Sequence, residues 1–89
     1  MRKTMNLKIV TPDRIFYEGK IDSITVRTTG GGRQILTNRR PFSSEIEEYP
    51  IRFKLEDDEK TVDVQGGFIN TEYDKVTVIT PKAEWVENE

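Results

Sequence analysis

The sequence of 89 residues contains neither cysteine nor histidine. Without cysteine the chain has no disulfide, no thiolate nucleophile and no sulfur ligand for a metal. Without histidine it has no imidazole base, no Ser-His-Asp arrangement and none of the common zinc sites. An enzyme would then need a carboxylate with a raised pKa, and most acids fall in predicted turns. We therefore expect no catalytic residue, no cofactor and no metal site.

The sequence also lacks a long apolar segment. No stretch approaches the ~20 apolar residues that span a bilayer, and the start, Met-Arg-Lys-Thr-Met, lacks the apolar region of a signal peptide. Apolar residues make up 34% of the chain and charged residues also 34%. The apolar residues nevertheless fall in short alternating runs, which favours a folded sheet protein over disorder. We expect a soluble, cytoplasmic protein that does not insert into a membrane.

Charge is distributed unevenly along the chain. Residues 45–89 contain thirteen carboxylates and five basic side chains. Residues 24–44 contain no carboxylate but four arginines, Arg27, Arg33, Arg39 and Arg40. This separation can orient a domain against a partner, and chance clustering is the alternative. Nucleic-acid binding is not expected, because the net charge is −2 and Phe42 is the only aromatic residue of the basic stretch.

Short alternating runs predict strands along most of the chain. The clearest is Ile51–Leu55, in which apolar and charged residues alternate strictly. Similar runs bounded by turn residues occupy residues 6–10, 15–17, 20–28, 33–37, 61–65, 68–69 and 76–80. About eight to ten short strands without a long helix predict an all-β fold, a small β-sandwich or flattened barrel.

Glycine and proline divide these runs. Pro12 predicts a turn after the first strand, and Gly19 predicts a bend into the strand of residues 20–28. No helix and no Gly-Lys-Ser/Thr motif follow Gly30–Gly32, so we expect a mobile loop there and not a phosphate cradle. Gly66–Gly67 predicts a corner or bulge where a Cβ atom would clash.

Two further local features each have an alternative interpretation. The acidic run Glu56–Glu59 predicts a hairpin tip, because it lacks the oxygen spacing and the glycine of a calcium loop. Phe16 and Tyr17 are candidate interface aromatics. Since adjacent residues of a strand face opposite ways, we expect Phe16 inward and Tyr17 at the surface.

The predicted runs indicate a single domain. We assign residues 1–5 to an N-terminal extension, residues 6–82 to the sandwich and residues 83–89 to a short C-terminal tail. The tail is long enough for at most two frayed helical turns. We expect Trp85 to dock back onto the sandwich.

Three motifs carry a family resemblance. Thr11-Pro-Asp-Arg-Ile-Phe-Tyr-Glu-Gly19, Gly66-Gly-Phe68 and Val76-Thr-Val78 follow one another in this order. Together they resemble the N-terminal β-sandwich domain of the epsilon subunit of rotary F-type ATP synthases, over about Asn6 to Ala83. The resemblance implies a non-catalytic rotor component that binds the central-stalk gamma subunit, contacts the c-ring and couples rotation to ATP synthesis. It also implies a place on the cytoplasmic side, peripheral to the inner or plasma membrane.

Residues 31–42 depart from the pattern of this family. Its members usually read Gly-Glu-Ile-Gly-Ile-Leu-Pro-Asn-His-Ala-Pro-Leu, in a loop that faces the stalk and the ring. This chain reads Gly-Gly-Arg-Gln-Ile-Leu-Thr-Asn-Arg-Arg-Pro-Phe. The two added arginines would favour an acidic partner surface, whereas a solvated loop is the alternative. The resemblance implies these candidate partner-binding residues: Thr11, Arg33, Ile35, Leu36, Asn38, Arg39, Arg40, Pro41 and Phe42.

In the family a C-terminal helical hairpin follows the sandwich and brakes ATP hydrolysis. The sequence ends at Glu89, about where that hairpin would begin, so we expect coupling without the brake. The alternative is a standalone epsilon-like sandwich that acts as a protein-binding module through its arginine-rich segment. A weak homodimer through an open edge strand is a further open alternative.

Overall fold

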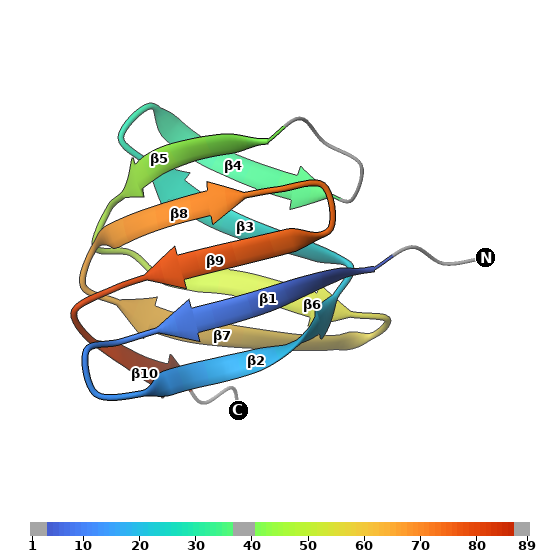
Figure 1. Cartoon of the computed structure of the whole chain (residues 1–89), viewed down its shortest axis with the longest axis horizontal. Helices are drawn as coiled ribbons and strands as arrows, with labels where there is room; N and C mark the ends of the chain where they lie inside the picture. The colour runs from blue at the N-terminus through green and yellow to red at the C-terminus, as the bar shows by residue number, and fades with distance from the viewer. Residues whose placement is uncertain (1–3, 37–40, 87–89) are drawn as a thin grey trace.

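The computed structural model describes residues 4–36 and 41–86, and all regular secondary structure in these ranges is β-strand (Figure 1). The ten strands are β1 (Met5–Val10), β2 (Ile15–Ile21), β3 (Ser23–Thr28), β4 (Gly31–Leu36), β5 (Phe42–Ile46), β6 (Ile51–Leu55), β7 (Asp58–Val64), β8 (Gly67–Thr71), β9 (Lys75–Ile79) and β10 (Ala83–Val86). The all-β fold and the number of short strands expected from the sequence are confirmed.

The strands form two layers that curl into a flattened barrel. The front layer of Figure 1 has the order β5-β8-β9-β1-β2, and the rear layer has the order β4-β3-β6-β7-β10. One backbone pairing, between Thr28 of β3 and Ile46 of β5, joins the layers along one side. Only β1 and β9 pair in parallel; the other pairings between described strands are antiparallel.

The core lies between the layers and is built from alternate residues of each strand. Leu7 and Ile9 of β1 and Val76 and Val78 of β9 are completely buried. Phe53 of β6 enters the same core from the rear layer. Burying each such side chain contributes about 1.5–3 kcal/mol relative to leaving it exposed. The alternation read from the sequence therefore identifies the inward face correctly.

The glycine pair at the β7–β8 corner is required by the backbone. Gly66 has φ +75° and Gly67 has φ +130°, a region that other residues rarely adopt. A Cβ atom on Gly67 would collide with the carbonyl oxygen of Ile79. The predicted corner is confirmed, and it brings the start of β8 against the end of β9.

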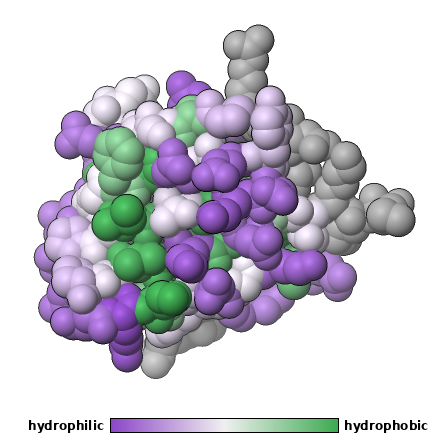
Figure 2. All heavy atoms as spheres, in the orientation of Figure 1, coloured by the Kyte–Doolittle hydropathy of each residue, from purple (hydrophilic) through white to green (hydrophobic). Residues whose placement is uncertain are grey.

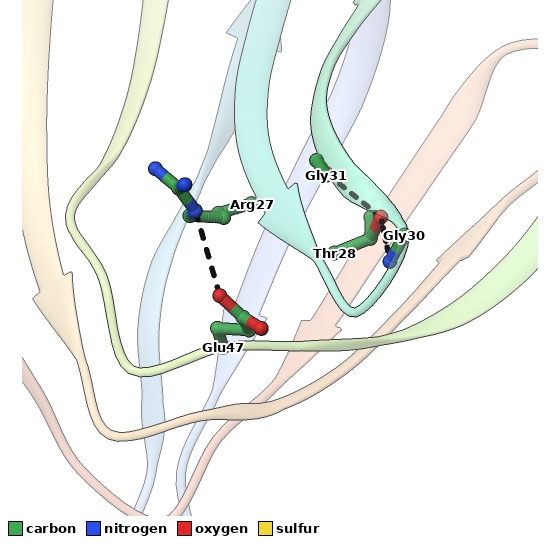
Figure 3. A network of polar contacts seen from close by, with 5 residues as sticks. All are labelled: Arg27, Thr28, Gly30, Gly31 and Glu47. Carbon is green, nitrogen blue, oxygen red and sulfur yellow. Dashed lines mark hydrogen bonds and ion pairs between the residues drawn. The ribbon is translucent and has the colours of Figure 1, made fainter.

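Two expectations about the other glycines are wrong. Gly19 lies inside β2, paired with Leu7, and the chain bends at Asp22 instead. Gly30–Gly32 does not form a mobile loop, since a tight turn leads directly into β4. The Thr28 hydroxyl donates to the Gly31 carbonyl at 2.8 Å and accepts from the Gly30 N–H at 3.2 Å (Figure 3). These local hydrogen bonds order the hairpin.

Residues 83–86 also differ from expectation. They form strand β10, which pairs antiparallel with β7, and not helical turns. The docking of Trp85 is confirmed: its ring lies 5.1 Å from that of Phe16 and 5.7 Å from that of Tyr17, measured between centroids. These rings close the side of the barrel where β2 and β10 lie next to each other (Figure 1).

The expected division between Phe16 and Tyr17 is wrong as well. Both side chains are half-buried against the core. The register between β1 and β2 shifts here, so that Tyr17 pairs with Ile9 and Ile15 pairs with Val10. Phe16 is thus the extra residue of a bulge, which breaks the strict in-and-out alternation.

Candidate docking surfaces

The candidate partner-binding residues do not form one surface. Thr11 follows β1 at the left of Figure 1, whereas β4 ends and β5 begins at the right. Thr11 is held in a turn by reciprocal backbone hydrogen bonds with Arg14 and by a bond from its hydroxyl to the Arg14 carbonyl. Three of the nine candidates, Asn38, Arg39 and Arg40, lie outside the described residues.

The remaining candidates lie on β4 and at the start of β5. Ile35 is only 3% exposed and belongs to the core, so its side chain is not offered to a partner. Leu36 is 46% exposed on the opposite face of β4. The Arg33 guanidinium carbon lies 5.3 Å from the ring centroid of Phe42, a cation–π contact between β4 and β5. Pro41 is exposed beside it.

The described arginines point to different faces. Val26 pairs with Arg33 and Arg27 pairs with Gly32, so Arg27 and Arg33 lie on opposite faces of the β3–β4 hairpin. Arg27 instead contacts Glu47 at 3.4 Å (Figure 3). Its guanidinium carbon also lies 4.9 Å from the ring centroid of Tyr49. The two arginines are close along the chain and were therefore expected to share one basic surface. The alternation of side chains along β3 and β4 places them on opposite faces instead.

A different surface carries the exposed apolar side chains of the front layer. On the outer face, Ile15 of β2, Val10 of β1, Ile79 of β9 and Phe68 of β8 are successive cross-strand partners. Ile15 is 50% exposed, Ile79 54% and Phe68 43%. Figure 2 shows them as a green stripe on the left of this face. We call these four residues the apolar row.

A groove continues from the apolar row around the end of the layer. It has a volume of about 480 Å³ and is lined by Thr11, Pro12, Gly67, Thr80, Pro81 and three residues of the row. The Thr80 N–H donates to the Val10 carbonyl at 3.0 Å, so the backbone beside the groove is satisfied. Of the predicted residues that the structure describes, Thr11 alone lines this groove.

Charged and polar side chains bound the apolar row. Glu45 of β5 pairs with Phe68 at one end, whereas the Arg14 guanidinium lies 5.8 Å from the centroid of the Phe16 ring. The next row along the strands is polar and includes Lys8 and Thr77, which pair with each other across β1 and β9. The apolar surface is therefore narrow, with a carboxylate at its Phe68 end.

The outer face of the rear layer has a different character. Its exposed side chains include Arg52 on β6, Asp63 on β7 and Glu84 on β10. A polar cleft of about 320 Å³ lies there between Tyr49, Lys82 and these acids. Among the described residues no group of histidine and carboxylate side chains could hold a metal ion. Hydrogen bonding to Asp58 raises the pKa of Lys60 in the β6–β7 hairpin, which keeps this amine protonated.

The sequence contained one signal for the apolar row that our reading missed. Three of its members are adjacent to a buried apolar residue, in the pairs Ile9–Val10, Phe68–Ile69 and Val78–Ile79. Such pairs break the alternation of apolar and polar residues that is expected in a strand with one face exposed to solvent. Each pair alone is unremarkable, and the register of four strands is needed to align them.

The described parts of the chain contain no helix long and apolar enough to cross a membrane.

Comparison with known proteins gives a consistent result. The family model of the beta-sandwich domain of the ATP synthase delta/epsilon chain matches residues 4–86. The "ATP synthase epsilon chain" of Clostridium novyi is 37% identical over 98% of this chain and 67% of its own length. Those of Caldanaerobacter subterraneus and Alkaliphilus metalliredigens are 36% and 33% identical, again over 98% of this chain. This chain spans 64% and 65% of their lengths, respectively.

Solved structures show the same fold at low sequence identity. A chain in the cryo-EM structure of the Euglena gracilis mitochondrial ATP synthase, comprising OSCP, F1 and c-ring, aligns with TM-score 0.87 and 18% identity. The alignment covers 92% of this chain and 53% of that one. A chain in the central stalk and c-ring structure of the Tetrahymena thermophila enzyme aligns with TM-score 0.77 and 14% identity, over 94% and 69%.

Proposed function

The chain belongs to the ATP synthase delta/epsilon family, in its beta-sandwich domain, and we propose that it is a non-catalytic rotor subunit of a rotary F-type ATP synthase. The observation that carries this proposal is the match of the family model over residues 4–86. In this role the chain binds the gamma subunit of the central stalk, contacts the c-ring and couples rotation to ATP synthesis. The complex places it peripheral to the membrane, on the cytoplasmic side.

The physical character of the domain supports a mechanical role. The described strands act in this proposal as one stiff body, because both layers share a single core of interdigitated side chains. The body measures 35 × 30 × 25 Å. A rigid sandwich that holds the stalk on the ring transmits torque without deforming. The lack of cysteine and histidine in the sequence agrees with a subunit that performs no chemistry.

Regulation of hydrolysis is not assigned to these residues. We propose that residues 1–89 contribute to coupling, since the resemblance described above assigns the brake to a helical hairpin outside the sandwich domain. Adding this chain to a cognate catalytic complex should leave the ATPase turnover rate unchanged, within about twofold. Strong inhibition by residues 1–89 alone would contradict this part of the proposal.

Co-purification tests the main proposal. The chain is co-expressed with its cognate gamma subunit, and a tag on gamma should recover both in equal amounts. The complex should persist at micromolar concentration. Absence of a complex under these conditions would overturn the proposal and favour the alternative, a standalone sandwich that binds another protein.

A further inference from the structure

We propose that the free edge of β4 is a strand-pairing site for a second copy of this chain. The two β4 strands pair antiparallel about Gln34, which joins the rear layers of both copies into one continuous sheet. The inference goes beyond the proposed function and does not depend on it. It assigns an edge and a register to the homodimer that the sequence left open.

The unpaired edge of β4 is the first reason to expect a second strand there. Among the described strands, β4 pairs with β3 along its whole length and with no other. It lies at the rim of the rear layer (Figure 1). The two ends of the strand order, β2 and β10, lie next to each other instead, and the rings of Phe16 and Trp85 close that side. The edge of β4 is therefore the one at which a strand can be added.

The geometry of the β3–β4 hairpin identifies the backbone groups on this edge. A two-residue loop joins the strands, so the flanking pair Thr28–Gly31 is hydrogen-bonded and the bonded pairs alternate from there. By the same alternation the Arg27 carbonyl points away from β4, and it accepts from the Glu47 N–H at 2.8 Å. Every second residue of β4 therefore turns its N–H and C=O away from β3, namely Gly32, Gln34 and Leu36.

The sequence of β4 has few of the features that protect an edge strand. Residues 31–36 contain no proline and no lysine, and the register with β3 runs without interruption. The one charged side chain is Arg33, whose guanidinium carbon lies 5.3 Å from the ring centroid of Phe42. Like charges directly opposite each other in a sheet are destabilising. Arg33 therefore restricts the register in which a second copy can pair.

Charge and side-chain size select one register for the self-pairing. A two-fold axis through Arg33 would place the two guanidinium groups opposite each other. An axis through Gln34 pairs the two glutamines, whose amides can donate and accept, and it pairs Leu36 of one copy with Gly32 of the other. Leu36 is 46% exposed, and a Cβ atom on Gly32 would meet nothing within 4 Å. The exposed Leu36 side chain therefore finds open space over Gly32 of the second copy.

The charge nearest to this contact is already compensated. Gly32 pairs with Arg27 on the outer face of the hairpin, and Arg27 contacts Glu47 at 3.4 Å (Figure 3). Leu36 of the second copy thus approaches an ion pair and not a lone cation. A single pair of short strands covers much less than the roughly 800 Å² per partner of a stable interface. The dimer is therefore weak and belongs to the concentrated free chain.

Single-cysteine variants test the register, because the chain contains no cysteine of its own. In the proposed dimer the two copies of residue 34 form a hydrogen-bonded pair with Cα atoms about 5.5 Å apart, a distance that a disulfide bridges. The two copies of residue 36 lie more than about 13 Å apart, because they are offset along the strands. With oxidised glutathione as the oxidant, Gln34→Cys should form a disulfide-linked dimer at least tenfold faster than the matched control Leu36→Cys. Non-reducing gel electrophoresis measures both rates.

Sedimentation measures the pairing without a cross-link. The wild-type chain should be largely dimeric at about 1 mM and monomeric at about 10 μM. Gln34→Pro removes an outward N–H but no hydrogen bond to β3, and it should weaken the association at least tenfold. The control Gln34→Thr keeps the N–H and should change the association less than about threefold.

Three results would overturn the inference. A monomeric wild-type chain at about 1 mM would exclude the dimer. Equal cross-linking rates for Gln34→Cys and Leu36→Cys would indicate random collisions and not a fixed register. A dimer that persists unchanged in Gln34→Pro would use another surface. A melting temperature for each variant excludes misfolding, and if Gln34→Pro fails to fold, Gln34→Lys replaces it, because two opposed ammonium groups should weaken the association about tenfold at low salt.

Discussion

The outer faces of the two layers differ although both layers pack against the same core. The front face carries the apolar row, Ile15, Val10, Ile79 and Phe68, whereas the rear face carries charged side chains such as Arg52 and Asp63. The inward residues are alike in the two layers, since both supply branched aliphatic side chains. Folding therefore fixes the inner faces and leaves the outer faces free. An outer face that is nevertheless apolar indicates a requirement other than stability.

The largest loss of stability is expected from a substitution at the Gly66–Gly67 corner. This corner holds β8 in register with β9, so its loss would also disrupt the apolar row on the front face. Gly67→Ala introduces a Cβ atom against the Ile79 carbonyl at φ +130°, and should destabilise the fold by about 4 kcal/mol. Chemical denaturation measures this loss. The control is Gly32→Ala, where a Cβ atom meets open space and the change should stay within about 1 kcal/mol. Equal effects would show that Gly67 is not constrained as described.

The next prediction compares the loss of stability at two adjacent residues of β8, of which one faces the core and the other faces solvent. Ile69 is completely buried, and Ile69→Ala should cost about 3 kcal/mol through lost transfer energy and a cavity. Phe68 is 43% exposed in the apolar row, and Phe68→Ala should cost less than about 1 kcal/mol. Urea titrations of both variants give the two values. A larger loss for Phe68 would mean that the row serves stability and not docking.

A third prediction concerns the side where the two layers meet. Trp85 contacts Phe16, Tyr17 and Phe53, with centroids 5.1, 5.7 and 6.3 Å away. Because Trp85 is 46% exposed, Trp85→Ala should cost about 2 kcal/mol, less than a fully buried aromatic. Thermal unfolding followed by circular dichroism provides the measurement. Trp85→Phe should recover part of the loss, and no loss in either variant would contradict a structural role for β10.

The smallest effect is expected on the charged rear face. Arg27 and Glu47 form an ion pair at 3.4 Å with both side chains 49% exposed. Such surface pairs contribute little, so Glu47→Gln should change the stability by less than about 0.5 kcal/mol. Raising the salt concentration should reduce even this difference. A change above 1 kcal/mol would show that the rear face also contributes to folding.

The sequence predicted the strands correctly where apolar and polar residues alternate within the strand itself. Ile51–Leu55 and the runs around Val62 and Val76 alternate clearly, and each is a strand. The pattern missed β5, because Phe42-Ser-Ser-Glu-Ile46 is a weak run that is held by pairing with β8 and by hydrogen bonds between Phe42 and Thr71. It also missed β10, whose four residues depend on pairing with β7. Short strands without local propensity are specified by their neighbours.

The same distinction applies to the candidate surfaces. Thr11 and Ile35 were both predicted from the sequence to bind a partner. In the structure Thr11 lines the groove, whereas Ile35 lies in the core. The apolar row was not predicted because its members come from positions 10, 15, 68 and 79. Because these positions are far apart along the chain, the cluster can be recognised only when the pairing of the strands is known.

By itself the sequence determined the all-β class, the inward residues of most strands, the glycine corner and the lack of thiol and imidazole chemistry, since these follow from residue type and from the local period of a strand. Only the tertiary structure decided that Arg27 and Arg33 face apart, that Phe16 and Tyr17 share one seam with Trp85, and that four distant apolar residues form a row. The reason is register: which residues face each other across a ladder depends on pairing between distant segments, and a shift of one position reverses every face.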